Sequence, residues 1–126
     1  MSGPRSRSVT WADPRELIRA TVEGELSGLE FLRGMIAGRI PPPPIGVLLG
    51  FEILEADAGR VLFALQPAEH HYNPNGVVHG GVAAMLLDTV TGCAVTSMLP
   101  YGVTCATLEL KVNYIRSLSE RSPRVE

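Results

Sequence analysis

Residues 73–88 combine residue types and spacing that could perform chemistry. Residues 73–81 read NPNGVVHGG, so His79 and two glycines stand where a long apolar stretch begins. If that stretch is a helix, its first turn presents N–H groups without intrahelical acceptors at the positive end of the helix dipole. Gly80 and Gly81 would let a ligand carbonyl approach closely, and an oxyanion forming there would be stabilised.

Asp88 is the second candidate for a chemical role, because it is the one acid within the apolar stretch. A carboxylate on an apolar helix is costly to bury unless it is paired or protonated. A raised pKa in a cleft is typical of a catalytic acid or base. The structural alternatives are a hydrogen bond from a hydroxyl such as that of Thr91, or contact with a water channel. The residues favour a functional carboxylate.

Gly80 and Asp88 cannot easily act on one atom from a single chain. They are eight residues apart, which corresponds to about 12 Å along a helix axis and about 80° around it. Two antiparallel copies of the helix would instead bring Asp88 of one chain near Gly80 of the other. We therefore expect a homodimer with two equivalent sites at its interface, as symmetry requires.

A metal site is the alternative use of these residues. His70, His71 and His79 could join Asp88 as ligands. Their spacing matches no established zinc pattern, and loop histidines more often act as surface or hydrogen-bonding groups. We expect no metal ligand set and no resident cofactor.

Composition narrows the class of protein. The 126 residues are 45% hydrophobic and 19% charged with a net charge of −2, which fits one globular domain without a basic field for nucleic acid. Cys93 and Cys105 fit free thiols in a reducing cytosol. The first residues lack the apolar segment of a signal peptide. Residues 80–99 have the length of a membrane span, but Asp88 would cost about 2.5–3.5 kcal/mol there. We expect a cytoplasmic protein without a membrane segment.

Local patterns predict the elements. Residues 1–12 are expected to form a disordered tail, and residues 13–126 a single domain. Two capping boxes predict helix starts, one at Asp13 with Glu16 and one at Ser27 with Glu30. The proline run at 41–44 is expected to exclude helix and to act as a stiff spacer.

Alternation and apolar runs predict the remaining elements. Residues 47–55 and 60–66 alternate and are expected to form a β-hairpin with a turn at Asp57–Gly59. A buried helix is expected over 81–99 and a strand over 104–115. The predicted class is α+β, with an antiparallel sheet wrapped around one central buried helix.

These residues also resemble a known family. NPNGVVHGGVAAMLLD resembles the signature of hotdog-fold acyl-CoA thioesterases, in particular the PaaI-like, phenylacetate-degradation group. GRVLFALQPAEHHYNPNG and TLELKVNYIRSL resemble strands of that family, so the likeness covers roughly residues 27–120. The resemblance implies a hotdog fold that hydrolyses an acyl- or aryl-acyl-CoA thioester to free acid and CoA. It also implies a homodimer or dimer of dimers with a shared site, in which coenzyme A enters as part of the substrate.

The resemblance also implies roles for individual residues. Asp88 matches the catalytic carboxylate, which acts as nucleophile or general base. Gly80 matches the glycine whose N–H polarises the thioester carbonyl. Asn73 matches the residue that orients the thioester or the water. His79 matches the histidine that supports the loop, and Thr107 matches a hydroxyl that holds the attacking water.

Substrate binding and the end of the chain complete the expectations. Gly81 is expected to contact substrate. Lys111 and Arg116 are candidate contacts for the CoA phosphates, and Arg121 and Arg124 are further candidates for the same role. The family continues with two further strands after the motif NYIRSL, whereas this chain continues only with SERSPRVE. We expect a C-terminally truncated domain that exposes apolar surface. The alternatives are a non-catalytic acyl-CoA binder or a truncated inactive thioesterase. A hotdog dehydratase would need a different arrangement of histidine and acid.

Overall fold

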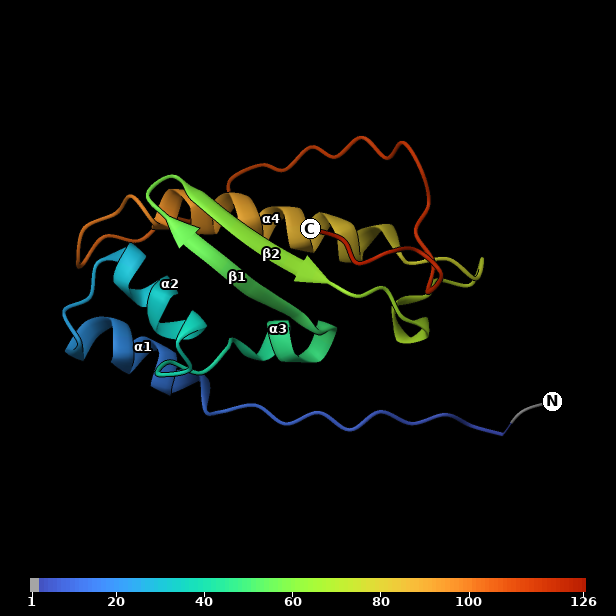
Figure 1. The fold of residues 1–126 in the computed structure, drawn as a ribbon, viewed down its shortest axis with the longest axis horizontal. Coiled ribbons are helices and arrows are strands. Elements are labelled where there is room, and N and C mark those ends of the chain that lie inside the picture. The colour runs from blue at the N-terminus through green and yellow to red at the C-terminus, as the bar shows by residue number, and fades with distance from the viewer. Residues whose placement is uncertain (1–2) are drawn as a thin grey trace.

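The protein was analysed as a computed structural model that describes residues 3–126. Three short helices precede one β-hairpin, and a long helix follows it (Figure 1), which confirms the predicted α+β class. The elements in chain order are α1 (Pro14–Glu23), α2 (Gly28–Ile36), α3 (Pro44–Leu49), β1 (Phe51–Asp57), β2 (Arg60–Leu65), the 3-10 helix η1 (Glu69–His71) and α4 (Gly80–Thr96).

The predicted hairpin is confirmed, although it begins later than expected. β1 and β2 pair antiparallel from Phe51 opposite Leu65 to Asp57 opposite Arg60, with an irregularity between Ile53 and Glu55. The turn between the strands contains Gly59 at φ +76°, a conformation that glycine adopts without a steric cost.

The expectation that the proline run excludes helix is wrong, as is the strand assignment of residues 47–49. Pro43 is the N-cap of α3 and Pro44 its first residue. Proline is tolerated there because the N–H groups of a first helical turn have no intrahelical acceptor, and its fixed φ suits a helix start. α3 ends at Gly50, which adopts a left-handed φ of +78°.

Helix caps explain where α1 and α2 begin. Ser27 and Glu30 form the predicted capping box, in which the Ser27 N–H donates to Glu30 Oε2 at 2.8 Å. In the capping box predicted for α1, the bond to the Asp13 side chain is present, but the reciprocal bond from the Glu16 side chain is not found among the described contacts. Asp13 caps the N–H of Arg15 at 3.0 Å.

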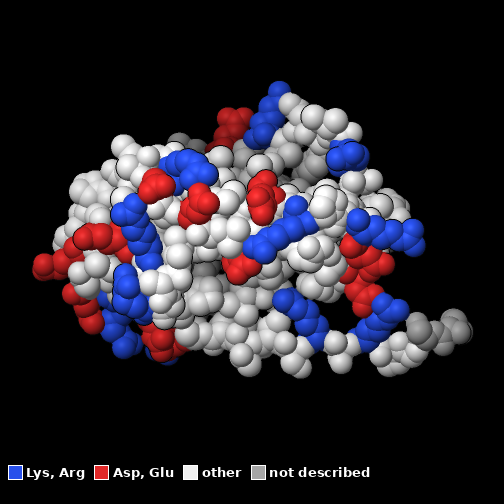
Figure 2. All heavy atoms as spheres, viewed as in Figure 1, with Lys and Arg blue, Asp and Glu red and all other residues white. Residues whose placement is uncertain are grey.

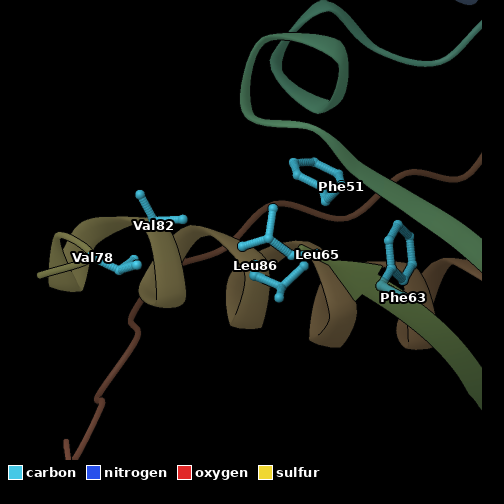
Figure 3. Close-up of a cluster of buried hydrophobic side chains, with 6 residues drawn as sticks. All are labelled: Phe51, Phe63, Leu65, Val78, Val82 and Leu86. Atoms are coloured by element: carbon cyan, nitrogen blue, oxygen red, sulfur yellow. The ribbon is translucent and has the colours of Figure 1, made fainter. Parts of the chain in front are cut away.

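The core lies between the hairpin and α4. Phe51 and Phe63 face each other across the strands with ring centroids 6.0 Å apart. Figure 3 shows the two rings beside Leu86 of α4 and Leu65 of β2, with Val82 and Val78 farther along toward the start of the helix. The buried cluster consists of Phe51, Phe63, Leu65, Val78, Val82 and Leu86. This burial sets the position of α4 against the sheet.

The predicted strand over 104–115 is wrong. This segment has no regular structure and runs as an extended chain along the side of α4 away from the hairpin (Figure 1). Its Leu108 and Ile115 are 99% exposed. A strand needs a neighbouring strand for its backbone hydrogen bonds. The described sheet holds only β1 and β2, so this segment pairs with no strand.

The outer edge of β2 is largely open. Leu65 and Val125 exchange N–H to carbonyl hydrogen bonds of 2.9 Å each, as one isolated antiparallel bridge. Beyond it, an apolar groove of about 240 Å³ separates β2 from α4, with Val61, Leu87 and Val90 among its lining residues. The groove leaves apolar side chains of β2 and α4 uncovered within the described residues.

The N-terminal segment is extended and mostly exposed over residues 3–12. Arg7 donates to the carbonyl oxygens of Val47 and Leu48 at the end of α3, and Arg5 pairs with Glu69. The disordered tail expected over residues 1–12 stays a prediction, and residues 1–2 lie outside the described part of the chain. None of the described helices combines the length and apolarity that crossing a bilayer requires.

Candidate active site

Asp88 and Thr107 meet although they lie on different segments. Asp88 is half-buried on α4, and the Thr107 hydroxyl donates to its Oδ1 at 2.6 Å. Thr91 instead donates to the backbone carbonyls of Leu87 and Asp88, at 2.9 and 3.1 Å. Within residues 3–126, no cation pairs with the Asp88 carboxylate and no donor contacts its Oδ2. One carboxylate oxygen is therefore oriented and the other is left for a substrate or a water.

His79 organises the start of α4. It is the N-cap, and its Nδ1 accepts the N–H of Gly81 at 2.9 Å. Its own backbone N–H donates to the His71 carbonyl at 2.7 Å. His71 is buried and bonds the Leu49 carbonyl through Nε2 at 2.7 Å. The loop before α4 is therefore braced against the end of α3, as a supporting role for His79 would require.

Gly80 and Gly81 are the first two residues of α4, and of these two only the Gly80 N–H lacks an acceptor among the described residues. No acceptor for the Gly80 N–H is found within residues 3–126, whereas the Gly81 N–H is capped by His79. The Gly80 carbonyl accepts the Tyr114 hydroxyl at 2.9 Å. A pocket of about 290 Å³ opens at this turn, and Tyr114 and Arg116 form part of its wall. An acceptor group in this pocket could reach the free N–H.

Asn73 shapes the loop and keeps a donor group available. Its Oδ1 accepts the N–H of Asn75 at 2.9 Å and that of Val77 at 3.5 Å. Its backbone N–H donates to the Val77 carbonyl at 2.8 Å, and Gly76 takes a φ of +74° within the turn. The side-chain amide N–H₂ of Asn73 has no partner among the described residues.

The predicted phosphate contacts are among the basic residues whose charge no acid neutralises within residues 3–126. Figure 2 shows basic and acidic side chains interspersed on one face of the molecule. Arg33, Arg60 and Arg124 each form an ion pair with an acid, whereas Arg121 forms none among the described residues. Lys111 and Arg116 are exposed and form no ion pair within residues 3–126. Their positive charge is therefore open to an anionic ligand.

The histidines and cysteines form no recognisable ligand set. No group of three potential metal-ligating side chains is found among the described residues. His70 packs 4.1 Å from His71, and burial lowers its pKa, with further contributions from the charges of His71 and Arg7. Cys93 and Cys105 are free thiols. Burial raises the pKa of Cys93 to about 11, and Cys105 adds to this shift.

A larger apolar cavity lies on the hairpin side of α4. It measures about 510 Å³ and is lined by parts of α2, α3, β1 and α4, including Met35, Val47, Phe51 and Phe63. Thr89 and Cys93 contribute its α4 wall. Asp88 precedes Thr89 on α4 but is not among the residues that line this cavity.

The structure divides the predicted site residues into two groups along α4. Asp88 and Thr107 form one group, while His79, Gly80 and Gly81 form the other at the helix start. α4 is one continuous helix, so the separation expected from helical rise holds within this chain. The sequence reasoning missed Tyr114. Tyr114 could have been noticed because it is a tyrosine among aliphatic residues in a strand-like pattern. The hydroxyl of a tyrosine in such a place usually needs a hydrogen-bond partner.

Comparison with known proteins places the chain in a family. The sequence model described as the thioesterase superfamily matches residues 75–125. In solved structures, the chain is similar to a proposed thioesterase of Ralstonia eutropha described as phenylacetic acid degradation-related. That likeness has a TM-score of 0.63 and 32% identity, over 70% of this chain and 68% of the other. A conserved protein of Pseudomonas aeruginosa gives a TM-score of 0.58 and 32% identity, over 62% of each chain. The chain belongs to the thioesterase superfamily, and the hotdog fold expected from its motif agrees with these neighbours.

Two curated relatives cover a shorter stretch. A proposed esterase of Halobacterium salinarum is 40% identical over 73 residues, which are 54% of this chain and 48% of that protein. The proposed esterase ComA2 of Bacillus subtilis is 31% identical over 74 residues, which are 57% of this chain and 58% of that protein. The matched region thus spans about half the length of these relatives.

Proposed function

We propose that this protein hydrolyses an acyl-CoA thioester to a carboxylic acid and free CoA. The observation that carries the proposal is the hydrogen bond of 2.6 Å between the Thr107 hydroxyl and the half-buried Asp88 carboxylate, in a chain of the thioesterase superfamily. A carboxylate held in one orientation without a compensating cation suits either a general base or a nucleophile.

The proposed reaction needs an acid–base group and an oxyanion donor. As a general base, Asp88 would take a proton from a water whose oxygen attacks the thioester carbonyl carbon. The carbonyl oxygen would become an oxyanion stabilised by the Gly80 N–H, and the C–S bond would then break. The thiolate of CoA would leave and take up a proton. As a nucleophile, Asp88 would first form a mixed anhydride that water hydrolyses.

We propose that two chains assemble this site. Asp88 and Thr107 of one chain would face Asn73, His79 and Gly80 of a second, because helical rise separates Gly80 from Asp88 within α4. The open N–H of Gly80 and the unpartnered amide of Asn73 would bind the thioester carbonyl. A homodimer satisfies this requirement, and a dimer of dimers repeats it.

The surroundings of α4 support a CoA ester as the substrate class. Arg116 at the pocket beside Gly80 and the exposed Lys111 would bind the phosphates of CoA. Gly81 has no side chain, so the substrate would be able to approach its backbone closely. The apolar cavity of about 510 Å³ would accept the acyl or aryl-acyl group. Two free cysteines fit a cytoplasmic location, because reducing compartments keep thiols unpaired.

Asp88→Asn tests the catalytic assignment. The amide cannot act as a base or as a nucleophile, so we expect the turnover number to fall by about 10²–10⁴-fold on a panel of short, medium and phenylacetyl CoA esters. Loss of thioester absorbance is the suitable readout, because the exposed Cys105 thiol would itself react with a thiol reagent. Asp57→Asn, at the end of β1, is the matched control. An Asp88→Asn variant as active as its parent would reject the role of Asp88.

Heavy-oxygen water separates the two roles of Asp88. In a single turnover with excess enzyme, label in Asp88 identifies a nucleophilic carboxylate, because only a mixed anhydride lets water attack the Asp88 carbonyl carbon. A general base transfers the label to the released acid and leaves Asp88 unlabelled. Peptide mass analysis of the α4 segment distinguishes these outcomes.

A non-catalytic acyl-CoA binder or an inactive member of the family is the second candidate. The open edge of β2 and the unpaired segment 104–115 favour it, because both leave the sheet incomplete around α4. Thermal stabilisation by a CoA ester without thioester loss would support this candidate, whereas turnover would exclude it.

A further inference from the structure

We propose that Tyr114 is a positioning residue for the oxyanion donor. Its side chain contacts the first turn of α4 at the Gly80 carbonyl and thereby holds Gly80, with its N–H, at the wall of the pocket. The catalytic meaning of this role rests on the proposed thioester hydrolysis, whereas the contact itself does not.

The hydroxyl of Tyr114 makes the first of three observations. It donates to the Gly80 carbonyl at 2.9 Å, although 34 residues separate the two in sequence. That carbonyl is also the acceptor for the N–H four residues later in a regular helix. A second donor on the same oxygen fixes the peptide plane that follows Gly80 and links α4 to the extended segment.

The aromatic ring of Tyr114 makes the second observation. A Cβ placed on Gly80 would lie 3.2 Å from Tyr114 Cζ and 3.3 Å from both Cε1 and the hydroxyl oxygen. A side chain at position 80 would therefore fit only if the Tyr114 ring moved away by a few tenths of an ångström. Gly80 was expected to leave room for a ligand, but on this side the room is taken by Tyr114. A ligand must reach the Gly80 N–H along the pocket, with the Tyr114 ring as one wall.

The backbone beyond Tyr114 makes the third observation. The Val78 N–H donates to the Leu118 carbonyl at 2.8 Å, so the segment that carries Tyr114 is tied to the chain just before Gly80. Residues 114–118 and 78–83 together enclose the pocket of about 290 Å³. Two hydrogen bonds therefore hold Gly80 in place, one from the Tyr114 hydroxyl and one between the backbones of Val78 and Leu118. Only the first can be removed by a single side-chain substitution.

Tyr114→Phe tests the role of the hydroxyl, and Tyr101→Phe is its matched control. The Tyr101 hydroxyl also donates to a backbone carbonyl, that of Val22, at 2.9 Å. The two tyrosines are similarly exposed, at 59% and 47%. Each substitution removes one hydroxyl and keeps the ring, so a difference between the two variants reports on position rather than on a general loss of stability.

Amide hydrogen exchange of the full chain is the readout that does not depend on activity. We expect exchange at Gly81 and Val82 to become about threefold to tenfold faster in Tyr114→Phe, which corresponds to the loss of one hydrogen bond. Tyr101→Phe should leave both rates unchanged. Unchanged rates in Tyr114→Phe, or equal acceleration in the two variants, would overturn the proposal.

Steady-state kinetics adds the catalytic test. We expect Tyr114→Phe to lower kcat by about threefold to tenfold with KM nearly unchanged, because a misaligned N–H loses strength mainly in the transition state. A change confined to KM would overturn the positioning role. If the parent protein hydrolyses no CoA ester, the proposed function fails, whereas the exchange comparison still decides about Tyr114.

A double-mutant cycle tests the ring. Gly80→Ala should lower the midpoint of thermal unfolding in the parent, because its Cβ meets the ring. The same substitution should lower it less in a Tyr114→Ala background. Equal effects in both backgrounds would contradict the contact.

Discussion

At the scale of single residues, Asp88 depends on a partner that no local pattern reveals. Thr107 is 19 residues away and lies in a segment without regular structure, yet its hydroxyl contacts the carboxylate at 2.6 Å. Thr91 is nearer in sequence, but its hydroxyl bonds backbone carbonyls of its own helix. A helical threonine hydroxyl readily donates to a backbone carbonyl of the preceding turn. The Thr91 hydroxyl is therefore not available to the Asp88 carboxylate.

Thr107→Val tests this contact. Valine keeps the shape and removes the donor to a charged group, so we expect kcat to fall at least about tenfold while the fold is retained. Thr107→Ser keeps a hydroxyl and should retain most of the activity. The measurement is thioester loss under saturating CoA ester, with circular dichroism to verify folding. Equal activity of the valine and serine variants would exclude a role for the hydroxyl.

At the scale of elements, the close crossing of α2 and α4 fixes how the long helix sits. Gly28, the first residue of α2, donates its N–H to the Leu99 carbonyl at 3.0 Å. A Cβ on Gly28 would lie 1.8 Å from the Thr96 carbonyl oxygen. Gly92 in α4 differs, since a Cβ there would meet nothing within 4 Å. The two glycines therefore serve different purposes, and only Gly28 is required by packing.

Alanine at these two positions should have opposite effects. Gly28→Ala forces the helices apart and should lower the free energy of unfolding by about 1–3 kcal/mol or more. Gly92→Ala removes a flexible residue from a helix interior and should raise it by about 0.5–1 kcal/mol. Urea denaturation of both variants measures the difference. A destabilised Gly92→Ala would show that α4 is not a regular helix there.

At the scale of the whole molecule, the exposed apolar surface bears on the proposed homodimer. Leu108 and Ile115 are 99% exposed on a segment with the alternation of a strand, and β2 is open beyond its bridge to Val125. The other edge of the hairpin is protected, because Arg33 Nε donates to the Ala56 carbonyl at 3.0 Å. Unpaired, apolar, strand-like segments favour association. This surface therefore supports the proposed homodimer.

Mixing two inactive variants tests whether the site is shared. Asp88→Asn removes the carboxylate. Asn73→Asp keeps the oxygen that accepts from Asn75 and removes the amide donors. If two chains build each site, subunit exchange creates hybrids with one site intact and the other doubly altered. We therefore expect the mixture to regain activity that neither variant has alone. Co-refolded Asp88→Asn with itself is the control, and no recovery after verified exchange would place all groups in one chain.

The features that could be predicted from the sequence are those that local patterns determine. The capping box of Ser27 and Glu30 lies within one helical turn, and the alternation of β1 and β2 with Gly59 specifies the hairpin. The motif of residues 73–88 indicated the family and the separation of Gly80 from Asp88. These signals are contained in a few consecutive residues, where backbone sterics and capping bonds act.

Only the tertiary structure decided the rest. Residues 104–115 alternate as a strand should, but without a neighbouring strand they remain an extended chain beside α4. Pro44 starts α3 because the first helical turn needs no proline N–H. The contacts of Thr107 with Asp88 and of Tyr114 with Gly80 join segments distant in sequence. Such pairings depend on which surfaces the fold brings together, and that is a property of the packed molecule rather than of any short stretch of chain.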